Sequence, residues 1–441
     1  MASKITSPKG FVEYLPKDQI KFDYLRNKIA ETYASFGFYH IATPAVEYMK
    51  TLSGEGDISK EVYAIKRAKG EMSGETPEGE EVSAENERGL RFDLTKPLAR
   101  YTAEHFGDLT FPFKRYQIQP VWRGERPQKG RLREFYQADV DIIGNGDLSA
   151  GYDFEILDVI ASTLDNLNIG QFVIKVNNRE SLQAILICFG IPGERFGDAL
   201  RIVDKLNKVG SQGVENSLVE EIGISRESAV NIVNLIDNKM EKEKYIALVE
   251  TLSDSLVSAK FVFDYADFTS RIKYKNISFT LDLSIARGLD YYTGMVFETE
   301  FVGYESYGSV ASGGRYENLA SEFTNQKLPG VGGSIGLSRL FTLIQNEGIG
   351  LSDPDKKTTL YITYFQEAQR KKAQELAKDL RDQSMIVEVA PEVIKLDKAL
   401  KYAINKEMDY LLILEEDGRI TRKDLKTREQ ITLLSKDDLK F

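Results

Sequence analysis

The first part of the chain alternates between helical and strand-like spacings of its apolar residues. Residues 20–36 carry large apolar side chains at steps of three and four, which predicts an amphipathic helix that ends at Gly37. Residues 38–44 have the composition of a strand, closed by a proline. Residues 69–88 are rich in Glu and Gly and contain almost no large apolar residue, which favours a surface loop or hairpin.

The middle of the chain predicts two strand-rich regions with a helical block between them. Residues 182–263 have helical spacing and are rich in Lys, Glu, Leu and Val, which indicates a helical insertion. A helix is expected at Tyr152–Leu167. Strands are expected at Leu90–Asp93, Phe113–Arg123, Phe135–Ile143, Phe172–Val176, Ser278–Leu283 and Val296–Phe301.

A polar, proline-containing linker at residues 353–357 is followed by a segment in which strand-like and helical patterns alternate. Strands are expected at Leu360–Phe365, Met385–Val389 and Tyr410–Leu414, helices at Glu367–Arg381 and Leu396–Lys406, and two last strands after the turn at Asp417–Gly418. Such alternation predicts a small α/β domain of roughly 80–90 residues, large enough to fold alone. We therefore expect a strand-rich core in two parts (1–181 and 272–350), an insertion (182–271), a linker (351–357) and a C-terminal domain (358–441).

Composition narrows the class of protein. A hydrophobic fraction of 42% and a charged fraction of 29% are ordinary for a soluble protein with real cores. The sequence has no run near the ~18 apolar residues of a membrane span, and residues 1–5 form no signal region, so we expect a cytoplasmic protein. A single cysteine, Cys188, excludes an internal disulfide and a cysteine-rich zinc site. With only His40 and His105, a histidine metal site or a Ser/His/Asp triad is not expected.

The net charge of −10 argues, taken alone, against a nucleic-acid partner, but its distribution is uneven. Residues 358–441 hold 16 basic and 16 acidic residues, so the whole excess lies in residues 1–357. Within that part, Phe113–Gln137 forms a basic segment that is interrupted only by Glu125 and Glu134. Its seven cations are Lys114, Arg115, Arg123, Arg126, Lys129, Arg131 and Arg133.

The basic segment has the pattern of a strand, a loop and a second strand. An arginine on a sheet can hold a phosphate with both of its nitrogens, and an aromatic residue such as Phe135 can stack on a base. Arg126, Lys129 and Arg131 would then be available for further phosphates. The alternative is a hairpin with a solvated basic tip, which the length of the run makes less favourable.

Two glycine-containing segments follow further along the chain. In Ala286–Gly294, the adjacent Tyr291 and Tyr292 would point to opposite faces of a strand, so that one can line a pocket. Beyond Ser312–Tyr316, the run Gly330–Leu340 contains the spacing G-x-G-G-x-x-G. A dinucleotide loop is discounted because no βαβ-type strand precedes this run and no acidic residue follows at the required distance. No P-loop sequence is present, so any nucleotide would be held by arginines and strands.

These segments together resemble the class II histidyl-tRNA synthetases over nearly the whole chain. Phe36–Glu47 is similar to class II motif 1, Arg123–Gln137 to motif 2 and Gly336–Leu340 to motif 3. Arg287–Tyr292 and Gly313–Tyr316 resemble the two signatures of the histidyl enzymes. The resemblance implies an α+β catalytic domain with an antiparallel sheet flanked by helices, a helical insertion, and a C-terminal α/β anticodon-binding domain.

The implied activity is that of a histidine–tRNA ligase, which makes histidyl-adenylate from ATP and histidine and then charges tRNA(His). Magnesium would accompany ATP through its phosphates. By resemblance, Arg123, Arg287 and Arg339 would be catalytic, and Arg287 would stabilise charge at the α-phosphate. The residues that would bind ATP are Arg123, Glu125, Arg131, Phe135 and Arg339.

The resemblance also implies a histidine site. The ammonium side would be Asp93, Thr95 and Gln137, and the imidazole side Asp141, Tyr292 and Tyr316, with Arg287 and Tyr291 beside them. A carboxylate and a hydroxyl suit the two ring nitrogens, and an apolar amino acid would leave both groups unpaired. The tRNA acceptor end would meet Arg126, Gln128 and Lys129, and motif 1 implies a homodimer.

The sequence departs from the family pattern in two places and leaves other functions to be weighed. Ser338 occupies a motif 3 position that is often acidic, and the turn at Glu415–Asp417 is more acidic than an RNA-binding surface favours.

The main alternative is a non-catalytic, histidine-sensing paralogue that acts as the regulatory subunit of ATP phosphoribosyltransferase. The intact motif 2 loop, Arg287 and the C-terminal domain argue against it. Another class IIa synthetase and an RNA-binding scaffold are further alternatives.

Overall fold

The computed structural model describes ten stretches of the chain: residues 5–52, 61–66, 87–126, 130–203, 205–237, 256–285, 292–317, 320, 323–351 and 357–441. Internal contacts divide the chain into two compact units, Met1–Leu351 and Ser352–Phe441. Each unit has its own hydrophobic core. Among the helices formed by the described residues, none is long and apolar enough to cross a membrane.

The first unit is built on an eight-stranded sheet with the order β1-β4-β5-β10-β9-β8-β6-β7. Neighbouring strands are antiparallel except for the pairs β1–β4 and β6–β7. The largely antiparallel sheet that the sequence predicts is therefore confirmed. In sheet order, the strands are β1 (Tyr39–His40), β4 (Phe113–Trp122), β5 (Glu134–Ile143), β10 (Gly330–Ile335), β9 (Ala311–Tyr316), β8 (Met295–Phe301), β6 (Phe172–Asn178) and β7 (Ile277–Leu281).

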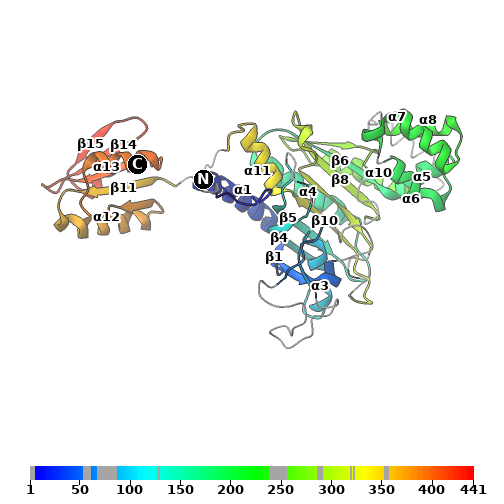
Figure 1. Cartoon of the computed structure of the whole chain (residues 1–441), viewed down its shortest axis with the longest axis horizontal. Coiled ribbons are helices and arrows are strands. Elements are labelled where there is room, and N and C mark those ends of the chain that lie inside the picture. The colour runs from blue at the N-terminus through cyan, green and yellow to red at the C-terminus, as the bar shows by residue number, and fades with distance from the viewer. Residues whose placement is uncertain are drawn as a thin grey trace. The chain divides into compact units, whose positions relative to one another are not determined.

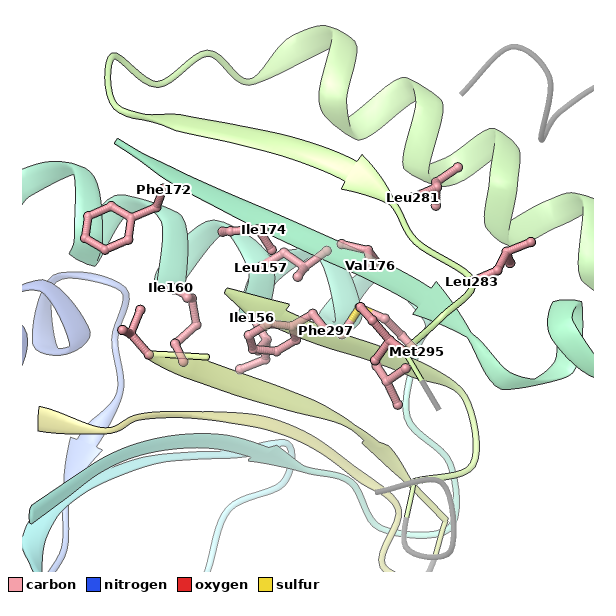
Figure 2. Packing of buried hydrophobic residues seen from close by; sticks show 14 of the residues in the cluster. Ile156, Leu157, Ile160, Phe172, Ile174, Val176, Leu281, Leu283, Met295 and Phe297 are labelled. Atoms are coloured by element: carbon pink, nitrogen blue, oxygen red, sulfur yellow. The ribbon is translucent and has the colours of Figure 1, made fainter. Parts of the chain in front are cut away.

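Helices α1 (Pro16–Ser35), α4 (Gly151–Leu167) and α11 (Leu337–Asn346) pack on this sheet. The apolar residues spaced along α1 are buried, which confirms the predicted amphipathic helix. In α4, Ile156 and Ile160 lie in the same buried cluster as residues of β6 and β8, such as Phe297 (Figure 2). Burial of such side chains stabilises the layer by roughly 1.5–3 kcal/mol each. One face of the sheet is thus filled with apolar side chains, and polar chemistry is left to the other face.

Helices also occupy the described parts of residues 179–271, as the sequence predicts. They lie beside β6 and β8 in Figure 1, and α5 contacts both α10 and β6. Their apolar faces continue the same core as the sheet. The helices are α5 (Arg179–Cys188), α6 (Phe196–Val203), α7 (Leu206–Ser217), α8 (Arg226–Asp237) and α10 (Leu256–Arg271), with short turns η3 (Gly193–Arg195) and η4 (Leu218–Ile222).

The predicted strand at Leu90–Asp93 is wrong in its position. The strand is β3 (Arg88–Leu90), which pairs with β2 (Val46–Tyr48) next to the short helix α2 (Met49–Leu52). The chain then enters helix α3 (Thr95–Glu104), where Asp93 Oδ1 accepts a hydrogen bond from the Lys96 amide at 3.1 Å. The Asp93 side chain caps the first turn of α3, so this residue belongs to the start of a helix and not to the strand that the apolar pattern suggests.

Three further expectations are corrected or lie outside the described residues. The strand expected at residues 38–44 is reduced to the two residues of β1. Tyr292 lies outside any strand, and Tyr291 is not among the described residues. Ser312–Tyr316 and the start of the Gly330–Leu340 run lie in strands (β9 and β10) that the sequence did not predict, because glycine disfavours strands unless another group must approach closely. Of the expected loop at 69–88, residues 69–86 lie outside the described residues.

The second unit follows the predicted strand and helix order closely. Its sheet has the order β12-β11-β13-β14-β15, parallel among the first three strands and antiparallel among the last three. Its elements are β11 (Thr359–Tyr364), η6 (Glu367–Gln369), α12 (Arg370–Asp382), β12 (Ile386–Val389), α13 (Leu396–Asn405), β13 (Tyr410–Leu414), β14 (Ile420–Asp424), β15 (Gln430–Leu433) and η7 (Lys436–Asp438).

Candidate active site

Strand β5 separates the apolar core from a polar face. Ala138, Val140 and Ile142 are fully buried among the helices. Side chains alternate along a strand, so the odd-numbered residues from Phe135 to Asp141 point to the opposite face of the sheet. The chemistry of the site therefore begins from this one alternating strand.

The register of the sheet places polar residues of four strands in one row. Asp139 of β5 is opposite Gln117 of β4 on one side and Ser334 of β10 on the other. Ser334 is in turn opposite Ser312 of β9. Residues paired across a sheet point to the same face, so this row crosses the floor of the site.

Two adjoining pockets open on this floor. The first, which we call the arginine pocket, has a volume of about 270 Å3. The second, the carboxylate pocket, has a volume of about 330 Å3 and contains Asp93, Asp139, Asp141, Tyr292 and Tyr316 in its lining. The two pockets share four lining residues: Arg123, Gln137, Ser312 and Ser334. A molecule in one pocket is therefore next to a molecule in the other.

The arginine pocket gathers the guanidinium groups of Arg123, Arg131 and Arg339. Arg339 donates hydrogen bonds to the carbonyl oxygens of Ser309 at 2.6 Å and Gly130 at 3.3 Å. Burial, followed by repulsion from Arg131 and Arg123, lowers the pKa of Arg339. Three cations held together against their repulsion form a site for a multiply charged anion.

Arg123 stands on the wall between the pockets, where its position is fixed from two sides. Its Nε donates to the Phe92 carbonyl at 3.0 Å, and its guanidinium carbon lies 5.1 Å from the centre of the Phe135 ring. Its side chain lines both pockets. Glu125 borders the arginine pocket and lies 3.4 Å from Arg131 Nη1.

In the carboxylate pocket, Asp141 is already engaged by the protein. Its Oδ2 lies 2.6 Å from Nη2 of Arg115, whose side chain is fully buried. Its Oδ1 accepts a hydrogen bond from the Tyr316 hydroxyl at 3.1 Å. Burial raises the pKa of Asp141, while Arg115 and Tyr316 act in the opposite direction.

Asp139 is the less satisfied of the two neighbouring carboxylates. It is 4% exposed, and its Oδ1 is buried with no hydrogen-bond partner among the described residues. Burial raises the pKa of Asp139 to about 7, with Asp141 adding to the shift and Arg115 and the Ser334 hydrogen bond opposing it. A buried acceptor that lines a cavity and lacks a donor is suited to a ligand that brings an N–H group.

The other walls of the carboxylate pocket come from distant segments. Asp93 and Thr95 come from the start of α3, and burial raises the pKa of Asp93. Gln137 donates to Ser334 Oγ at 3.1 Å, while its own Oε1 is buried and has no partner in the part of the chain that the structure describes. Burial also raises the pKa of Tyr292, with Asp141 and Asp139 adding to the shift, so its hydroxyl is a neutral donor.

Two glycines of β10 make room for the carboxylate pocket. A Cβ at Gly332 would collide with the Asp141 carboxylate, and a Cβ at Gly330 would collide with the Tyr316 ring. The glycine run is thus a strand whose missing side chains leave space for Asp141 and Tyr316. This need for space explains its glycine content, and no dinucleotide-binding loop is required.

Ser338, the departure in motif 3, has a structural role. Its hydroxyl oxygen accepts a hydrogen bond from the Tyr136 amide of β5 at 2.8 Å. The contact ties the first turn of α11, which carries Arg339, to the strand that carries Phe135 and Gln137. A serine can therefore hold the two motifs in register.

Most of the predicted site residues converge on these pockets. Arg123, Glu125, Arg131, Phe135 and Arg339 line the arginine pocket, and Asp93, Thr95, Gln137, Asp141, Tyr292 and Tyr316 line the carboxylate pocket. Arg126 is exposed and lines neither pocket. Arg287, Tyr291, Gln128 and Lys129 lie outside the described residues.

Sequence reasoning missed Asp139, Ser334 and the role of Arg115. The alternation of β5 could have indicated Asp139, which shares a face with Gln137 and Asp141. Ser334 was hidden in a glycine run that did not predict a strand. Arg115 was counted only as part of the basic segment, although it is fully buried.

Comparison with known proteins matches the chain to one family. Residues 10–340 match the family model described as Histidyl-tRNA synthetase. The chain is 37% identical to the histidine–tRNA ligase of Clostridium tetani over 98% of its own length and 96% of that protein.

Solved structures agree with the match. The crystal structure of histidyl-tRNA synthetase from Nostoc sp. PCC 7120 has a TM-score of 0.83 and 32% identity, with 98% of this chain and 97% of that chain covered. A Bacillus halodurans structure titled ATP phosphoribosyltransferase regulatory subunit/histidyl-tRNA synthetase shares the fold, with a TM-score of 0.70 at 20% identity over 92% of this chain and 97% of its own. The chain therefore belongs to the histidyl-tRNA synthetase family.

Proposed function

We propose that this protein is a histidine–tRNA ligase that activates histidine with ATP and transfers it to tRNA(His). The observation that carries the proposal is the pair of oppositely charged pockets that share Arg123 and Gln137. One pocket suits a polyphosphate, and its neighbour suits a small molecule with cationic and N–H groups. The arrangement brings the two reactants together at the shared wall.

ATP occupies the arginine pocket in this proposal. Arg123 holds the α-phosphate, and Arg131 and Arg339 hold the β- and γ-phosphates. Phe135 stacks on the adenine, whose amino group donates to Glu125. The repulsion that lowers the pKa of Arg339 is relieved when the phosphates bind. Magnesium enters as the complex with ATP, and among the described residues no cluster of His, Cys, Asp or Glu forms a separate metal site.

Histidine occupies the carboxylate pocket. Asp93, Thr95 and Gln137 surround its ammonium group, while Asp141, Tyr292 and Tyr316 surround its imidazole. Asp139 supplies an additional acceptor for an imidazole N–H, since both oxygens of Asp141 already contact the protein. An amino acid that lacks an N–H in its side chain would leave this carboxylate unpaired, which is a strong source of discrimination.

The chemistry is nucleophilic displacement at phosphorus followed by acyl transfer. A carboxylate oxygen of histidine attacks the α-phosphorus of ATP, the bond to the β-phosphate oxygen breaks, and pyrophosphate leaves. The terminal ribose hydroxyl of tRNA then attacks the acyl carbon, and AMP leaves with the bonding electrons. Arg123 lines both pockets, so it can bind the reacting carboxylate and stabilise the charge that develops on the α-phosphate.

Arg287 is proposed as a second cation at the α-phosphate. We expect Arg287→Ala to lose several kcal/mol of transition-state stabilisation, because a preorganised charge acts mainly on the transition state. Single-turnover formation of the adenylate measures this loss. Adenylate formation at the wild-type rate would refute the role.

Recognition of tRNA is assigned to two parts of the chain, a loop of the catalytic core and the C-terminal domain. The acceptor end meets the loop that contains Arg126, Gln128 and Lys129, where the additional 5′ guanosine of histidine tRNAs is the expected target of Gln128. Residues 1–181 and 272–350 form the catalytic core, and residues 182–271 form an insertion domain. Residues 358–441 form the anticodon-binding domain. A protein of this function acts where translation occurs, which supports a cytoplasmic location.

We also propose a homodimer formed through the motif 1 region. The edge strand β1 exposes 73% of Tyr39, and Val46 of the neighbouring β2 is 39% exposed. An edge strand with exposed apolar side chains favours association. Light scattering at micromolar concentration is expected to give the mass of two chains, and a monomer would refute the proposal.

The decisive experiment is histidine-dependent exchange between ATP and pyrophosphate, with proline, threonine and glycine in parallel and with or without tRNA. Exchange with histidine alone is the expected result. Histidine binding without any exchange would overturn the ligase function and favour the regulatory paralogue. Charging of tRNA(His) by the same preparation tests the second step separately.

A further inference from the structure

The segment that contains Tyr292 is bonded to the first residue of helix α5, Arg179. Arg179 is the first residue of α5, directly after β6. Its amide donates to the Gly294 carbonyl at 2.9 Å, and its Nη1 donates to the Tyr292 carbonyl at 2.9 Å. Backbone and side chain of one residue thus hold both ends of the strap Tyr292–Gly294.

The strap has a defined position on the sheet as well. The Thr293 amide donates to the Arg315 carbonyl of β9 at 2.8 Å. The Tyr292 ring lies against Gly314, where a Cβ would be 2.8 Å from the ring carbons. The ring can therefore lie in the carboxylate pocket only while the strap stays close to β9, and Arg179 is one of the groups that hold it there.

The other side of Arg179 faces the insertion. Its guanidinium carbon lies 5.6 Å from the centre of the Phe196 ring, within the range of a cation–π contact. Phe196 is the first residue of α6, is 4% exposed, and belongs to the same buried cluster as Leu200 and Val203 of that helix. A displacement of α6 would consequently move the partner of Arg179.

We infer that Arg179 is a positioning residue for the histidine side of the site: it holds the Tyr292 strap in place and links that position to helix α6 of the insertion. The inference rests on the proposed role of the carboxylate pocket in binding histidine. It predicts that changes at Arg179 and Phe196 affect histidine more than ATP, although neither residue lines either pocket. By thermodynamic linkage, histidine binding in turn favours one position of α6.

The test measures the KM of histidine and of ATP in pyrophosphate exchange for Arg179→Ala, Arg179→Lys and Phe196→Leu. We expect Arg179→Ala to raise the KM of histidine about tenfold and that of ATP less than about twofold, because the histidine contacts alone depend on the strap. Arg179→Lys, which keeps a donor and the charge, recovers part of the loss. Phe196→Leu keeps the apolar volume and raises the KM of histidine a few-fold.

Arg226→Ala is the matched control, since Arg226 donates to a side chain elsewhere in the insertion, Asn216 Oδ1, at 3.1 Å. It should leave both KM values unchanged. In a Tyr292→Phe background, Arg179→Ala should cost less than in the wild type, because both changes act through one ring. Equal effects on histidine and ATP, or additivity of the two changes, would overturn the inference. Absence of histidine-dependent exchange in the wild type would instead overturn the proposed function.

Discussion

The arginine and carboxylate pockets lie side by side, yet the protein holds their charged groups in different ways. In the arginine pocket, Arg123 and Arg339 are bonded to backbone carbonyls, and the side chain of Arg131 is 53% exposed. In the carboxylate pocket, the ion pair of Arg115 and Asp141 connects two side chains that are 0% and 8% exposed.

This difference separates two kinds of mutational effect. Removal of a guanidinium from the arginine pocket leaves carbonyl groups that water can reach, so the fold changes little and the loss falls on the ligand. Removal of a charged group in the carboxylate pocket either leaves its buried partner unpaired or removes a buried charge that lacked a partner. The free energy of unfolding therefore changes together with the affinity for the ligand. Each of the following predictions tests this separation.

The largest effect is expected at the shared wall. Arg123→Ala should lower the kcat/KM of pyrophosphate exchange by roughly 10²–10³-fold, which corresponds to the loss of about 2.7–4 kcal/mol of charge stabilisation in the transition state. Arg123→Lys should recover only part of the activity, because an ammonium group cannot bind two oxygens in the manner of a guanidinium. Steady-state kinetics and thermal unfolding are measured on the same samples.

Arg201→Ala is the control for Arg123, since Arg201 is an exposed arginine that pairs with Asp198 on the insertion. Its activity should equal that of the wild type. A large fall in unfolding temperature for Arg123→Ala would contradict the view that the arginine pocket binds its ligand without supporting the fold.

The next largest effect is expected at Gly332, which leaves space for the Asp141 carboxylate. Gly332→Ala places a methyl group against the Asp141 carboxylate and 2.9 Å from the Val140 carbonyl oxygen. We expect the KM of histidine to rise by a few tens-fold and the free energy of unfolding to fall by about 1–3 kcal/mol, the usual cost of overpacking. The KM of ATP should change far less. Exchange kinetics and chemical unfolding measure the three quantities.

Gly333→Ala is the matched comparison, because its Cβ would point into the core, 2.8 Å from the Phe297 ring. It should lose a similar free energy of unfolding without a selective effect on histidine. If both alanines acted equally on the two substrates, β10 would support the site only by general stability.

The two pockets also differ in how far the sequence predicted them. The arginine pocket could be foreseen because four of its predicted residues lie in one segment, Arg123–Phe135, whose two strands were predicted correctly. The residues that line the carboxylate pocket come from β5, β9, β10, the start of α3 and the segment of Tyr292, and the alignment of its side chains depends on the register of the strands. Register is decided by cross-strand pairing and burial, which no local pattern contains.

The same contrast holds for the fold. In the C-terminal unit, each predicted strand and helix appears within a residue or a few, because every element carries a clear apolar period. In the first unit, β9 and β10 were missed because they are rich in glycine. The glycines of β10 make space for Asp141 and Tyr316, and Gly314 of β9 makes space for the Tyr292 ring. Their composition reflects the site more than the strand, and local rules fail where function sets the residues.

A smaller effect on the KM of histidine is expected at Asp139, where the substitution should raise the free energy of unfolding and not lower it. Asp139→Asn should raise the KM of histidine by about tenfold, because a charged acceptor is lost. The pKa of Asp139 rises from 3.8 to about 7 on folding, so the native state binds more protons between those values. The contribution of this group to the free energy of unfolding of the wild type is therefore complete below pH 4 and is lost as the pH rises through 7.

The asparagine variant has no such titration. It should therefore gain about 1–3 kcal/mol over the wild type at pH 8, with little difference near pH 4. Unfolding in urea across this pH range measures the difference. A variant that is less stable at pH 8, or one with an unchanged KM for histidine, would show that the Asp139 carboxylate is satisfied by the protein itself.

The smallest effect is expected at the hydroxyl of Tyr316, where both pockets are left intact. Tyr316→Phe removes the donor to Asp141 Oδ1 and keeps the ring over Gly330. Since this hydrogen bond lowers the pKa of Asp141, its loss should raise that pKa. Asp141 must be ionised to accept from imidazole, so the acid limb of kcat/KM for histidine should move to higher pH, with a loss of only a few-fold at pH 8. The ATP profile should not move, because Asp141 does not line the arginine pocket. A shift of both profiles would mean that the charge of Asp141 acts across the shared wall, and the two pockets would then have to be treated as one electrostatic unit.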